Sequence, residues 1–478
     1  MRKRECIIYT HEYLFWDENV LGALPQVHGA QFTAHWNQPD IKRRCLALLH
    51  RSGCFDEFLR LAPPTLLQGK ECSFPALANV DELLLVHDIE YIKKLQGLQG
   101  CGDFGEEAFF TSQTYDIVSR VAKMAINAAK KSCEERAITY VLTGCPGHHA
   151  EPSRARGFCI LNYLAIAVAS RLDLSQNSRF IIFDFDAHAP NGTQCKFAND
   201  PRILLISFHQ AGCYPYDSDN GRHTGRLEQI GDFHNIINLP LPPGSGAGAY
   251  KYAIQHVLIP AVTRFGNCNG FFVSAGYDAG FMDPLARMNL GSRTFHYFGQ
   301  IIQQLAHDFC QDTIFCFHEG GYSSAHVPFS CLAFLQGLCA QNNSQNIHCP
   351  FQDELDAMGP LNNELQPHQQ TIIDRVAQQH QLHGLHGLQP QFEDSEVPAY
   401  FKCPLSLEIM QDPVYLHTDS GHSFERSMLQ KELETNPYQD PITKVHYEHK
   451  LRFGPNRSLK DAIEDWKRKK SYHSPLIN

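Results

Sequence analysis

Side chains that can bind a metal ion follow two apolar runs of the sequence. Asp186 and His188 stand two residues apart in the segment DFDAH, so an extended turn can direct both at one point. Asp278 follows a later run, in AGYDAG, and offers a further oxygen ligand. Two carboxylates and one imidazole suit Zn²⁺ with an open coordination position, the pattern of catalytic zinc. Helix capping could explain Asp184 or Asp186 alone, but it explains the three ligands together poorly.

Acid–base groups are expected beside this metal site. The adjacent residues His148 and His149 follow a Pro-Gly turn, and paired imidazoles can divide the roles of base and acid. Such roles need acceptors on the remote ring nitrogens, and Asp184 and Asn191 are placed to provide them. Tyr322 follows two glycines and is a natural hydrogen-bond donor to a developing oxyanion.

The elements that must position these groups can be predicted from hydrophobic patterns. Five apolar runs are predicted strands, and they cover residues 138–142, 180–183, 203–207, 270–274 and 313–317. Helical patterns lie between them, for example over 115–131. Strands that are apolar on both faces and joined by helices favour a mainly parallel sheet with helices on both faces. Polar segments follow four of the strands, at the edge where open α/β sheets bind ligands.

Composition limits the class of protein. The chain has 478 residues, 43% hydrophobic and 19% charged, which indicates a globular protein of more than one domain. A net charge of -10 speaks against direct nucleic-acid binding over a broad surface. No apolar stretch reaches the ~20 residues of a membrane span, and the apolar run near the start is too short for a signal peptide.

Cysteine content and charge runs bear on location. The 17 cysteines are scattered and odd in number, which favours reduced thiols in an intracellular protein of the cytoplasm, the nucleus or both. The basic run KRKK at 467–470 could be a nuclear-localisation patch, although a solvated helix end is the preferred interpretation.

A change in composition predicts two domains. Residues 384–397 are polar, contain Gly and end acidic, so we expect a linker between a large domain at 1–383 and a small one at 398–474. The small domain is predicted to be hairpin, helix, hairpin, helix. It contains one cysteine, Cys403, so it lacks the paired spacing of a structural zinc site.

Five segments of the large domain, PGHHA, GFCILN, DFDAHAPNGTQ, SAGYDAGFMDPLARM and HEGGY, resemble the zinc-dependent histone deacetylase superfamily. The likeness is greatest to its class II and acetylpolyamine-amidohydrolase-like branch, and it implies an arginase-like α/β fold with a narrow tunnel to Zn²⁺. The metal ligands implied are Asp186, His188 and Asp278. By the same resemblance His149 is the general base with His148 as its partner, and Tyr322 donates its hydroxyl in the transition state.

The resemblance also implies a tunnel wall and a second ion. The tunnel residues implied are Gly157, Phe158, Tyr214, Leu285, Gly320 and Gly321. An inner K⁺ would be bound by Asp184, Asp186, His188, Ser207 and the carbonyl of Phe208. Two segments depart from the family pattern. Ala189-Pro190 stands where the family has His-Gly, and residues 35–44 match its HPxxPxR pattern only loosely, so no arginine is assigned to acetate exit.

The small domain resembles a U-box, the zinc-free α+β relative of the RING domain found in ubiquitin ligases. The segments FKCPLSLEIMQDPV, SGHSFER, DPIT and GPNRSLKDAIEDW carry this resemblance. It implies that Leu405, Leu407 and Pro441 contact a ubiquitin-conjugating enzyme and that Lys444 is a basic contact to that enzyme or its ubiquitin. An ordinary core role remains the alternative for the two leucines.

These observations favour a lysine deacetylase that acts on an acetylated protein, a histone included, fused to a ubiquitin-ligase module. One alternative is hydrolysis of acetylpolyamines. Another is a catalytically weak acetyl-lysine-binding protein whose U-box supplies the only activity, and a third treats the U-box as a docking module. A U-box also implies a eukaryotic ubiquitin system, the protein's own or, for a bacterial chain, that of a host cell into which it is delivered.

Overall fold

The computed structural model describes residues in two parts of the chain. In the N-terminal part these are 5–11, 36–62, 75–172, 177–216, 222–339 and 364–382. In the C-terminal part they are 401, 403–405, 409–417, 423–447, 449–457, 459–460 and 463–464. Contacts between Cα atoms divide the chain into two compact units, Met1–Leu388 and Gln389–Asn478. The expected linker at 384–397 and the basic run at 467–470 lie outside the described residues.

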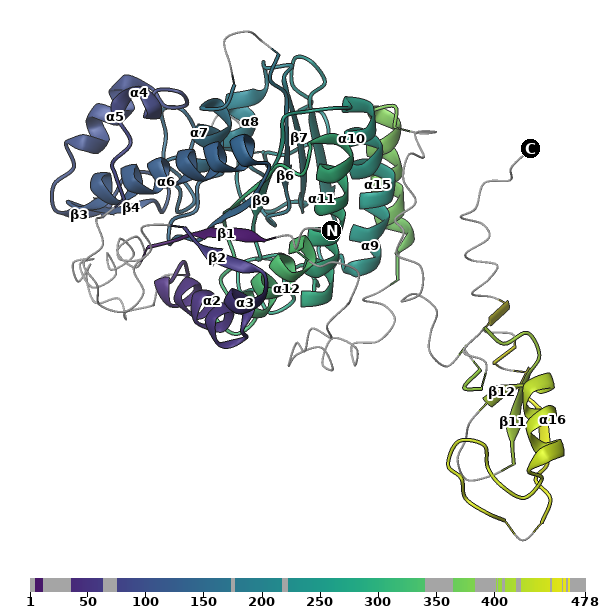
Figure 1. Ribbon diagram of the computed structural model, residues 1–478. Helices are drawn as coiled ribbons and strands as arrows, with labels where there is room; N and C mark the ends of the chain where they lie inside the picture. The colour runs from purple at the N-terminus through teal and green to yellow at the C-terminus, as the bar shows by residue number, and fades with distance from the viewer. Residues whose placement is uncertain are drawn as a thin grey trace, which may run out of the picture. The chain divides into compact units, whose positions relative to one another are not determined.

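An eight-stranded parallel sheet forms the centre of the larger unit (Figure 1). Its spatial order is β2-β1-β5-β10-β9-β6-β7-β8. The strands are β1 (Cys6–Tyr9), β2 (Leu59–Leu61), β5 (Ile138–Val141), β6 (Phe180–Asp184), β7 (Ile203–Gln210), β8 (Ile236–Leu241), β9 (Gly270–Ala275) and β10 (Ile314–His318). All five predicted strands are present with small shifts at their ends, and the predicted parallel α/β fold is confirmed.

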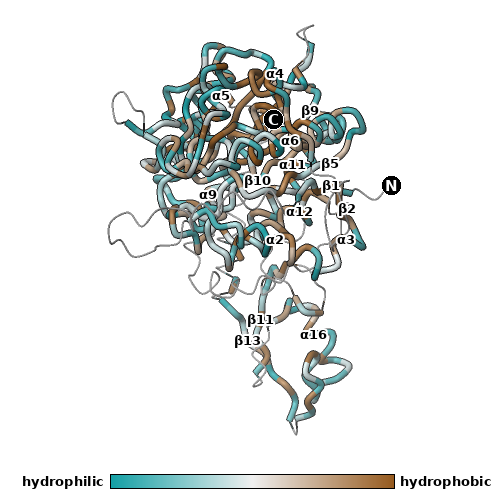
Figure 2. The backbone as a smooth tube through the Cα atoms, turned by 90° about the vertical axis from the view of Figure 1, so that its left-hand side faces the viewer, coloured by the Kyte–Doolittle hydropathy of each residue, from teal (hydrophilic) through white to brown (hydrophobic). Residues whose placement is uncertain are grey.

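The sheet is apolar on both faces because successive side chains of a strand point to opposite sides. In β6, Ile181 and Phe183 belong to one hydrophobic core, whereas Phe180 and Ile182 belong to the other. All four are buried. Figure 2 shows the hydrophobic segments running through the middle of the larger unit. Helices must therefore cover both faces.

Two groups of helices provide this cover (Figure 1). The core that contains Ile181 also takes side chains from α2 (Pro39–Arg51), α9 (Ala247–Ala253), the π-helix Ile254–Leu258, α10 (Ile259–Phe265), α11 (Ser292–Phe309), α12 (Val327–Cys339) and α15 (Pro367–Gln379). The core that contains Ile182 takes them from α4 (Val80–Leu83), α5 (Ile89–Gln96), α6 (Thr114–Glu135), α7 (Tyr163–Ala169) and α8 (Asn191–Phe197). The short helix α3 (Cys54–Glu57) and the hairpin of β3 (Cys101–Asp103) and β4 (Phe109–Thr111) complete the described elements of this unit.

The longest helix shows how the sequence produces this packing. The helix predicted at 115–131 is α6, and Val118, Val121 and Ala125 lie buried along its inner face. It ends at Arg136, whose φ of 53° is left-handed. Among the described residues, no helix has the length and apolar character needed to cross a lipid bilayer.

The order of the central strands brings distant segments together. Strands β5, β10, β9 and β6 are consecutive neighbours in the sheet, although β5 and β10 are far apart in sequence. Because all pairs are parallel, their carboxyl ends meet at one edge. The four polar segments singled out in the sequence all follow these strands.

The smaller unit contains a three-stranded antiparallel sheet, in the order β12-β11-β13, and a helix after β12. Residues 457, 459–460 and 463–464 are also helical, where the last helix was predicted. Its elements are β11 (Pro413–Leu416), β12 (Ser423–Glu425), α16 (Arg426–Thr435) and β13 (Phe453–Pro455). Val414, Phe424, Leu429 and Cys403 lie buried in its core. The first predicted hairpin is β11–β12, but β13 pairs with β11, and in the described residues the second hairpin is reduced to a bridge between Gln439 and His446.

Candidate active site

The three predicted metal ligands lie together at the carboxyl edge of the sheet. Asp186 and His188 follow β6, and Asp278 follows β9. One ligand atom of each lies within 4.8 Å of those of the others, and all three residues are buried. His188 Nδ1 is 2.8 Å from Asp278 Oδ2 and 3.1 Å from Asp186 Oδ1. Burial and the charge of Asp186 raise the pKa of the Asp278 carboxyl, so a bound cation would relieve this crowding of negative charge.

Backbone groups orient the carboxylates of this cluster. The N–H of Ala187 donates to Asp278 Oδ1 at 2.7 Å, and the N–H of Gly320 donates to Asp186 Oδ2 at 2.9 Å. A Cβ at Gly320 would lie 2.6 Å from Asp186 Oδ2, and one at Gly276 would lie 2.1 Å from it. Glycine is therefore required where the loops after β9 and β10 approach the ligands. The buried carboxylate–imidazole set fits a Zn²⁺ ion.

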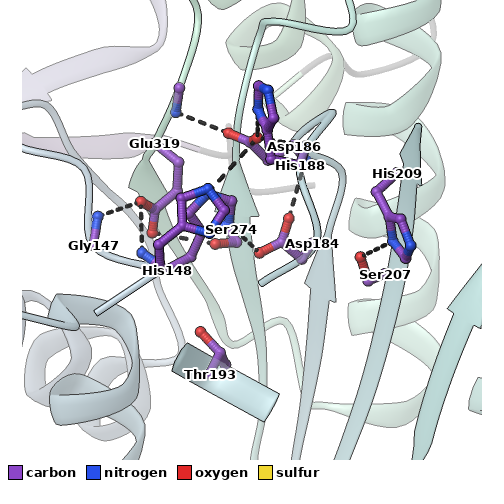
Figure 3. A network of polar contacts seen from close by, with 12 residues as sticks. Gly147, His148, Asp184, Asp186, His188, Thr193, Ser207, His209, Ser274 and Glu319 are labelled. Carbon is purple, nitrogen blue, oxygen red and sulfur yellow. Dashed lines mark hydrogen bonds and ion pairs between the residues drawn. The ribbon is translucent and has the colours of Figure 1, made fainter. Parts of the chain in front are cut away.

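The tandem histidines differ in their partners, and Figure 3 shows those of His148. His148 Nδ1 is 3.1 Å from Asp184 Oδ2, as predicted, and although burial lowers its pKa, the charges of Asp186 and Asp184 outweigh burial and raise it. His149 Nδ1 is 2.8 Å from the amide oxygen of Asn191. Burial and the neighbouring charges of His148 and His188 lower the pKa of His149 well below its ordinary value. The surroundings therefore shift the pKa values of the two imidazoles in opposite directions.

Aromatic side chains surround the histidines. The Tyr214 ring lies edge-on to His149, with 5.1 Å between ring centroids, and the Phe158 ring lies edge-on to Tyr322 at 5.7 Å. Gly157 has a φ of 55°, and a Cβ there would lie 2.7 Å from the Tyr214 ring. These predicted tunnel residues come together, and Tyr322 is half-buried beside them. Burial and the charge of Asp186 keep the pKa of the Tyr322 hydroxyl well above its ordinary value, so it remains a donor.

The remaining predicted residues lie nearby. Leu285 is half-buried, and its N–H donates to Asp283. Gly321 has a φ of 127°, and a Cβ there would lie 3.0 Å from the Cβ of Tyr277. Ser207 stands opposite Asp184 in the register of β6 and β7, and Phe208 follows it. The Ser207 hydroxyl is 2.8 Å from His209 Nδ1 (Figure 3).

Three carboxylates of the site were not singled out from the sequence. Glu319 is fully buried and accepts hydrogen bonds from the N–H of Gly147 at 2.6 Å, the N–H of His148 at 3.2 Å and the hydroxyl of Ser274 at 3.2 Å (Figure 3). Asp283 and Glu151 are the other two, and both accept hydrogen bonds next to predicted site residues. The segments HEGGY, MDPLARM and HHAE contain the only sequence signal, a carboxylate close to a catalytic candidate.

The predicted contact residues of the smaller unit are only partly described. Lys444 is exposed with a φ of 59°, between the exposed side chains of Ile442 and Val445. Pro441 is buried, and Leu405 is half-buried against the core of this unit. Leu407 lies outside the described residues.

A buried cluster of potential metal ligands beside two histidines, at the carboxyl edge of a parallel α/β sheet, is the arrangement expected of a metal-dependent hydrolase. Residues 42–338 match the family profile of the histone deacetylase domain, and residues 397–472 match that of the U-box domain. The chain belongs to the histone deacetylase family, and its C-terminal part is a U-box domain.

Known proteins agree with this assignment. The histone deacetylase-like amidohydrolase of Pseudomonas aeruginosa is 33% identical over 330 residues, which are 68% of this chain and 82% of that protein. Histone deacetylase 14, chloroplastic, of Arabidopsis thaliana is 33% identical over 283 residues, 56% of this chain and 65% of that protein. The crystal structure of the HDA15 HD domain has a TM-score of 0.63 and 21% identity, covers 78% of this chain and 95% of that one, and supports the fold alone.

Proposed function

We propose that this chain is a zinc-dependent lysine deacetylase joined to a U-box that recruits a ubiquitin-conjugating enzyme. Its catalytic domain would span residues 1–383 and its U-box 398–474, with a linker at 384–397. The observation that carries the first part is the buried cluster of Asp186, His188 and Asp278 beside two differently partnered histidines.

Zn²⁺ fits the cluster, and Asp186, His188 and Asp278 would hold it. When bound, the ion supplies a Lewis acid for the acyl oxygen and for a water molecule. K⁺ would occupy the neighbouring site of Asp184, Asp186 and His188, with Ser207 and the Phe208 carbonyl. The adjacency of Ser207 and Asp184 in the sheet supports this second ion.

The protein's own residues move the protons. His149 is neutral and can accept the proton of the attacking water, because its low pKa leaves it unprotonated at neutral pH. The hydroxyl of Tyr322 donates a hydrogen bond to the oxyanion of the tetrahedral intermediate. His148, held by Asp184, stabilises the charge that develops on the histidine pair, and this pair returns a proton to the leaving amine. Acetate and the lysine amine are the products.

An acetyl-lysine side chain suits the aromatic walls beside these groups. Phe158 and Tyr214 offer apolar surface that can hold the methylene chain, and Leu285 would add to it.

One experiment tests the enzymatic proposal. The purified full-length chain, loaded with Zn²⁺, is expected to release acetate from an acetyl-lysine peptide. Asp278→Asn should abolish release, and Tyr322→Phe should lower kcat about 10²- to 10³-fold, as expected for the loss of an oxyanion donor. Preferential hydrolysis of acetylputrescine would contradict the proposed substrate. The absence of acetate release from either compound would contradict the proposed enzymatic activity.

A further inference from the structure

The amide of Asn191 can face His149 in two ways, and the choice decides whether His149 can act as a base. A neutral imidazole carries one hydrogen on its two ring nitrogens, either on Nδ1 or on Nε2. If the amide oxygen faces Nδ1, that nitrogen carries the hydrogen and Nε2 keeps a free lone pair. If the amide is rotated by half a turn, its NH₂ group faces Nδ1, the hydrogen moves to Nε2, and that nitrogen can no longer accept a proton.

The position of Asn191 itself is fixed by the backbone. Asn191 is the first residue of α8, and the N–H groups of Gly192 and Thr193 both donate to the carbonyl of His148, at 3.1 and 3.2 Å. A Cβ at Gly192 would lie 2.2 Å from the carbonyl oxygen of Ala150, so the start of the helix lies directly against the tandem-histidine loop. The remaining freedom is the rotation of the amide.

A carboxylate removes that freedom. The Asn191 NH₂ group donates to Glu151 Oε1 at 2.6 Å, and it also approaches the carbonyl of His149 at 3.3 Å. An ionised carboxylate accepts hydrogen bonds but has no hydrogen to donate. Glu151 therefore holds the NH₂ side of the amide, and the amide oxygen is left facing His149 Nδ1 at 2.8 Å.

A buried cation holds Glu151 in turn. Arg156 donates to Glu151 Oε1 at 3.0 Å, and its side chain is only 4% exposed. Arg156 also donates to the hydroxyl of Tyr214 at 3.3 Å and to the carbonyl of Tyr216 at 2.8 Å. These bonds join the carboxylate to the tunnel wall and keep it aligned.

We propose that Glu151 is a positioning residue that, through the amide of Asn191, holds His149 in the tautomer with its hydrogen on Nδ1. This inference rests on the proposed function, in which His149 is the base. Glu151 acts by orienting a partner of the base, whereas Asn191 makes the contact. A positioning role of this kind predicts a loss in kcat with an unchanged KM.

The kinetic test first removes the Glu151 carboxylate, which accepts from Asn191, and then replaces the amide of Asn191. Glu151→Met is expected to lower kcat about 10- to 100-fold, because the amide then loses the shorter of the two hydrogen bonds that fix its orientation. Glu151→Gln should stay close to the wild type, since one amide oxygen can take the place of Oε1. Adding Asn191→Asp to Glu151→Met should restore kcat, because both oxygens of an aspartate accept and its rotation changes nothing.

A matched control makes the same chemical change elsewhere. Glu82 pairs with Lys123 and has a side chain 20% exposed, against 27% for Glu151. Glu82→Met should leave kcat unchanged. Wild-type kcat in Glu151→Met, a Glu151→Gln variant as slow as Glu151→Met, or a double variant as slow as Glu151→Met would each overturn the inference.

The tautomer can also be read directly. In full-length protein labelled with ¹⁵N-histidine, two-bond ¹⁵N–¹H couplings distinguish the two neutral forms, and His149→Phe identifies the signal. The wild type is expected to show the Nδ1–H form, and Glu151→Met a mixture. An Nε2–H form in the wild type, or an unchanged spectrum in Glu151→Met, would refute the positioning role. A wild-type protein that shows the expected tautomer but releases no acetate would instead refute the proposed deacetylase activity.

Discussion

The buried carboxylates of the site differ in what each one faces. Asp278 faces His188 and the proposed metal position, whereas Glu319 faces two backbone N–H groups and the hydroxyl of Ser274. Glu319 thus ties the tandem-histidine loop to the end of β10, directly before the segment that carries Tyr322. Residues of one chemical type therefore divide into ligands and anchors according to their immediate neighbours.

The anchor Glu319 predicts a pH-dependent effect on stability. Burial raises its pKa from 4.5 to about 7, so the folded protein keeps a proton that the unfolded chain loses between these values. Stability therefore falls as pH rises through this window. In Glu319→Gln the amide oxygen can still accept from the two N–H groups, and the NH₂ group can donate to the Ser274 hydroxyl, without a charge. The difference in Tm between Glu319→Gln and the wild type should become more positive from pH 5 to pH 8, as measured by calorimetry.

Removal of the whole side chain gives the control. Glu319→Ala leaves the N–H groups of Gly147 and His148 without their acceptor, and it should lower Tm at both pH values. An equal difference in Tm at pH 5 and pH 8 for Glu319→Gln would show that Glu319 has no raised pKa.

For single residues, the sequence predicts the proposed metal ligands better than the carboxylates that hold loops in place. Asp186, His188 and Asp278 could be chosen because their types and spacing suit a metal. Glu151, Glu319 and Asp283 could not, because their roles depend on which N–H groups lie opposite them after folding. A carboxylate near a catalytic segment is too common a pattern to assign a partner.

Among the secondary-structure elements, Asp283 joins two loops of the site. Its Oδ2 accepts from the N–H of Tyr322 at 2.8 Å, and its Oδ1 accepts from those of Leu285 at 2.9 Å and Ala286 at 3.2 Å. One carboxylate thus holds the loop after β9 against the loop after β10. The oxyanion donor and the predicted tunnel residue share a single anchor.

The shared anchor predicts coupling between two substitutions. Asn can accept on one side only, so Asp283→Asn should lower kcat about tenfold through misplacement of Tyr322. In the Tyr322→Phe background the same substitution should have little further effect, because the donor is already absent. Steady-state kinetics of the four proteins test this, and fully additive losses would show that Asp283 does not act through Tyr322.

The helices and strands could be predicted where their hydrophobic pattern is long and continuous. Strands such as β6 and β9 are continuous apolar runs buried on both faces, so hydrophobicity identifies them. β1, β2 and β8 were not predicted. The first two have four and three residues, and β8 contains Pro240, so their assignment depends on pairing with neighbours rather than on local sequence.

The whole molecule combines two units whose proposed chemistry can be separated. The exposed Lys444 lies in the smaller unit, and all three proposed metal ligands lie in the larger one. Lys444→Glu should weaken self-ubiquitination with a purified conjugating enzyme, because it reverses a charge at the proposed contact, and should leave acetate release unchanged. Asp278→Asn should have the opposite pattern. Loss of both activities in either variant would contradict this separation.

Metal removal should also affect one unit alone. A ligand that binds the folded state stabilises it, so a zinc chelator should lower the Tm of the larger unit and added Zn²⁺ should restore it. The transition of the smaller unit should not move, since its described part contains no predicted ligand. Calorimetry of the full-length chain would show this, and an unchanged Tm of the larger unit would argue against a resident ion.

The position of β10 has a consequence for synthesis on the ribosome. Of the eight strands in the sheet, β10 is the last to be made, yet it lies between β5 and β9. Until it emerges, a nascent chain holds two sheet fragments with open edges and has neither Glu319 nor Tyr322. Partial translation products therefore lack two residues of the proposed active site, and they expose strands to aggregation or chaperone binding.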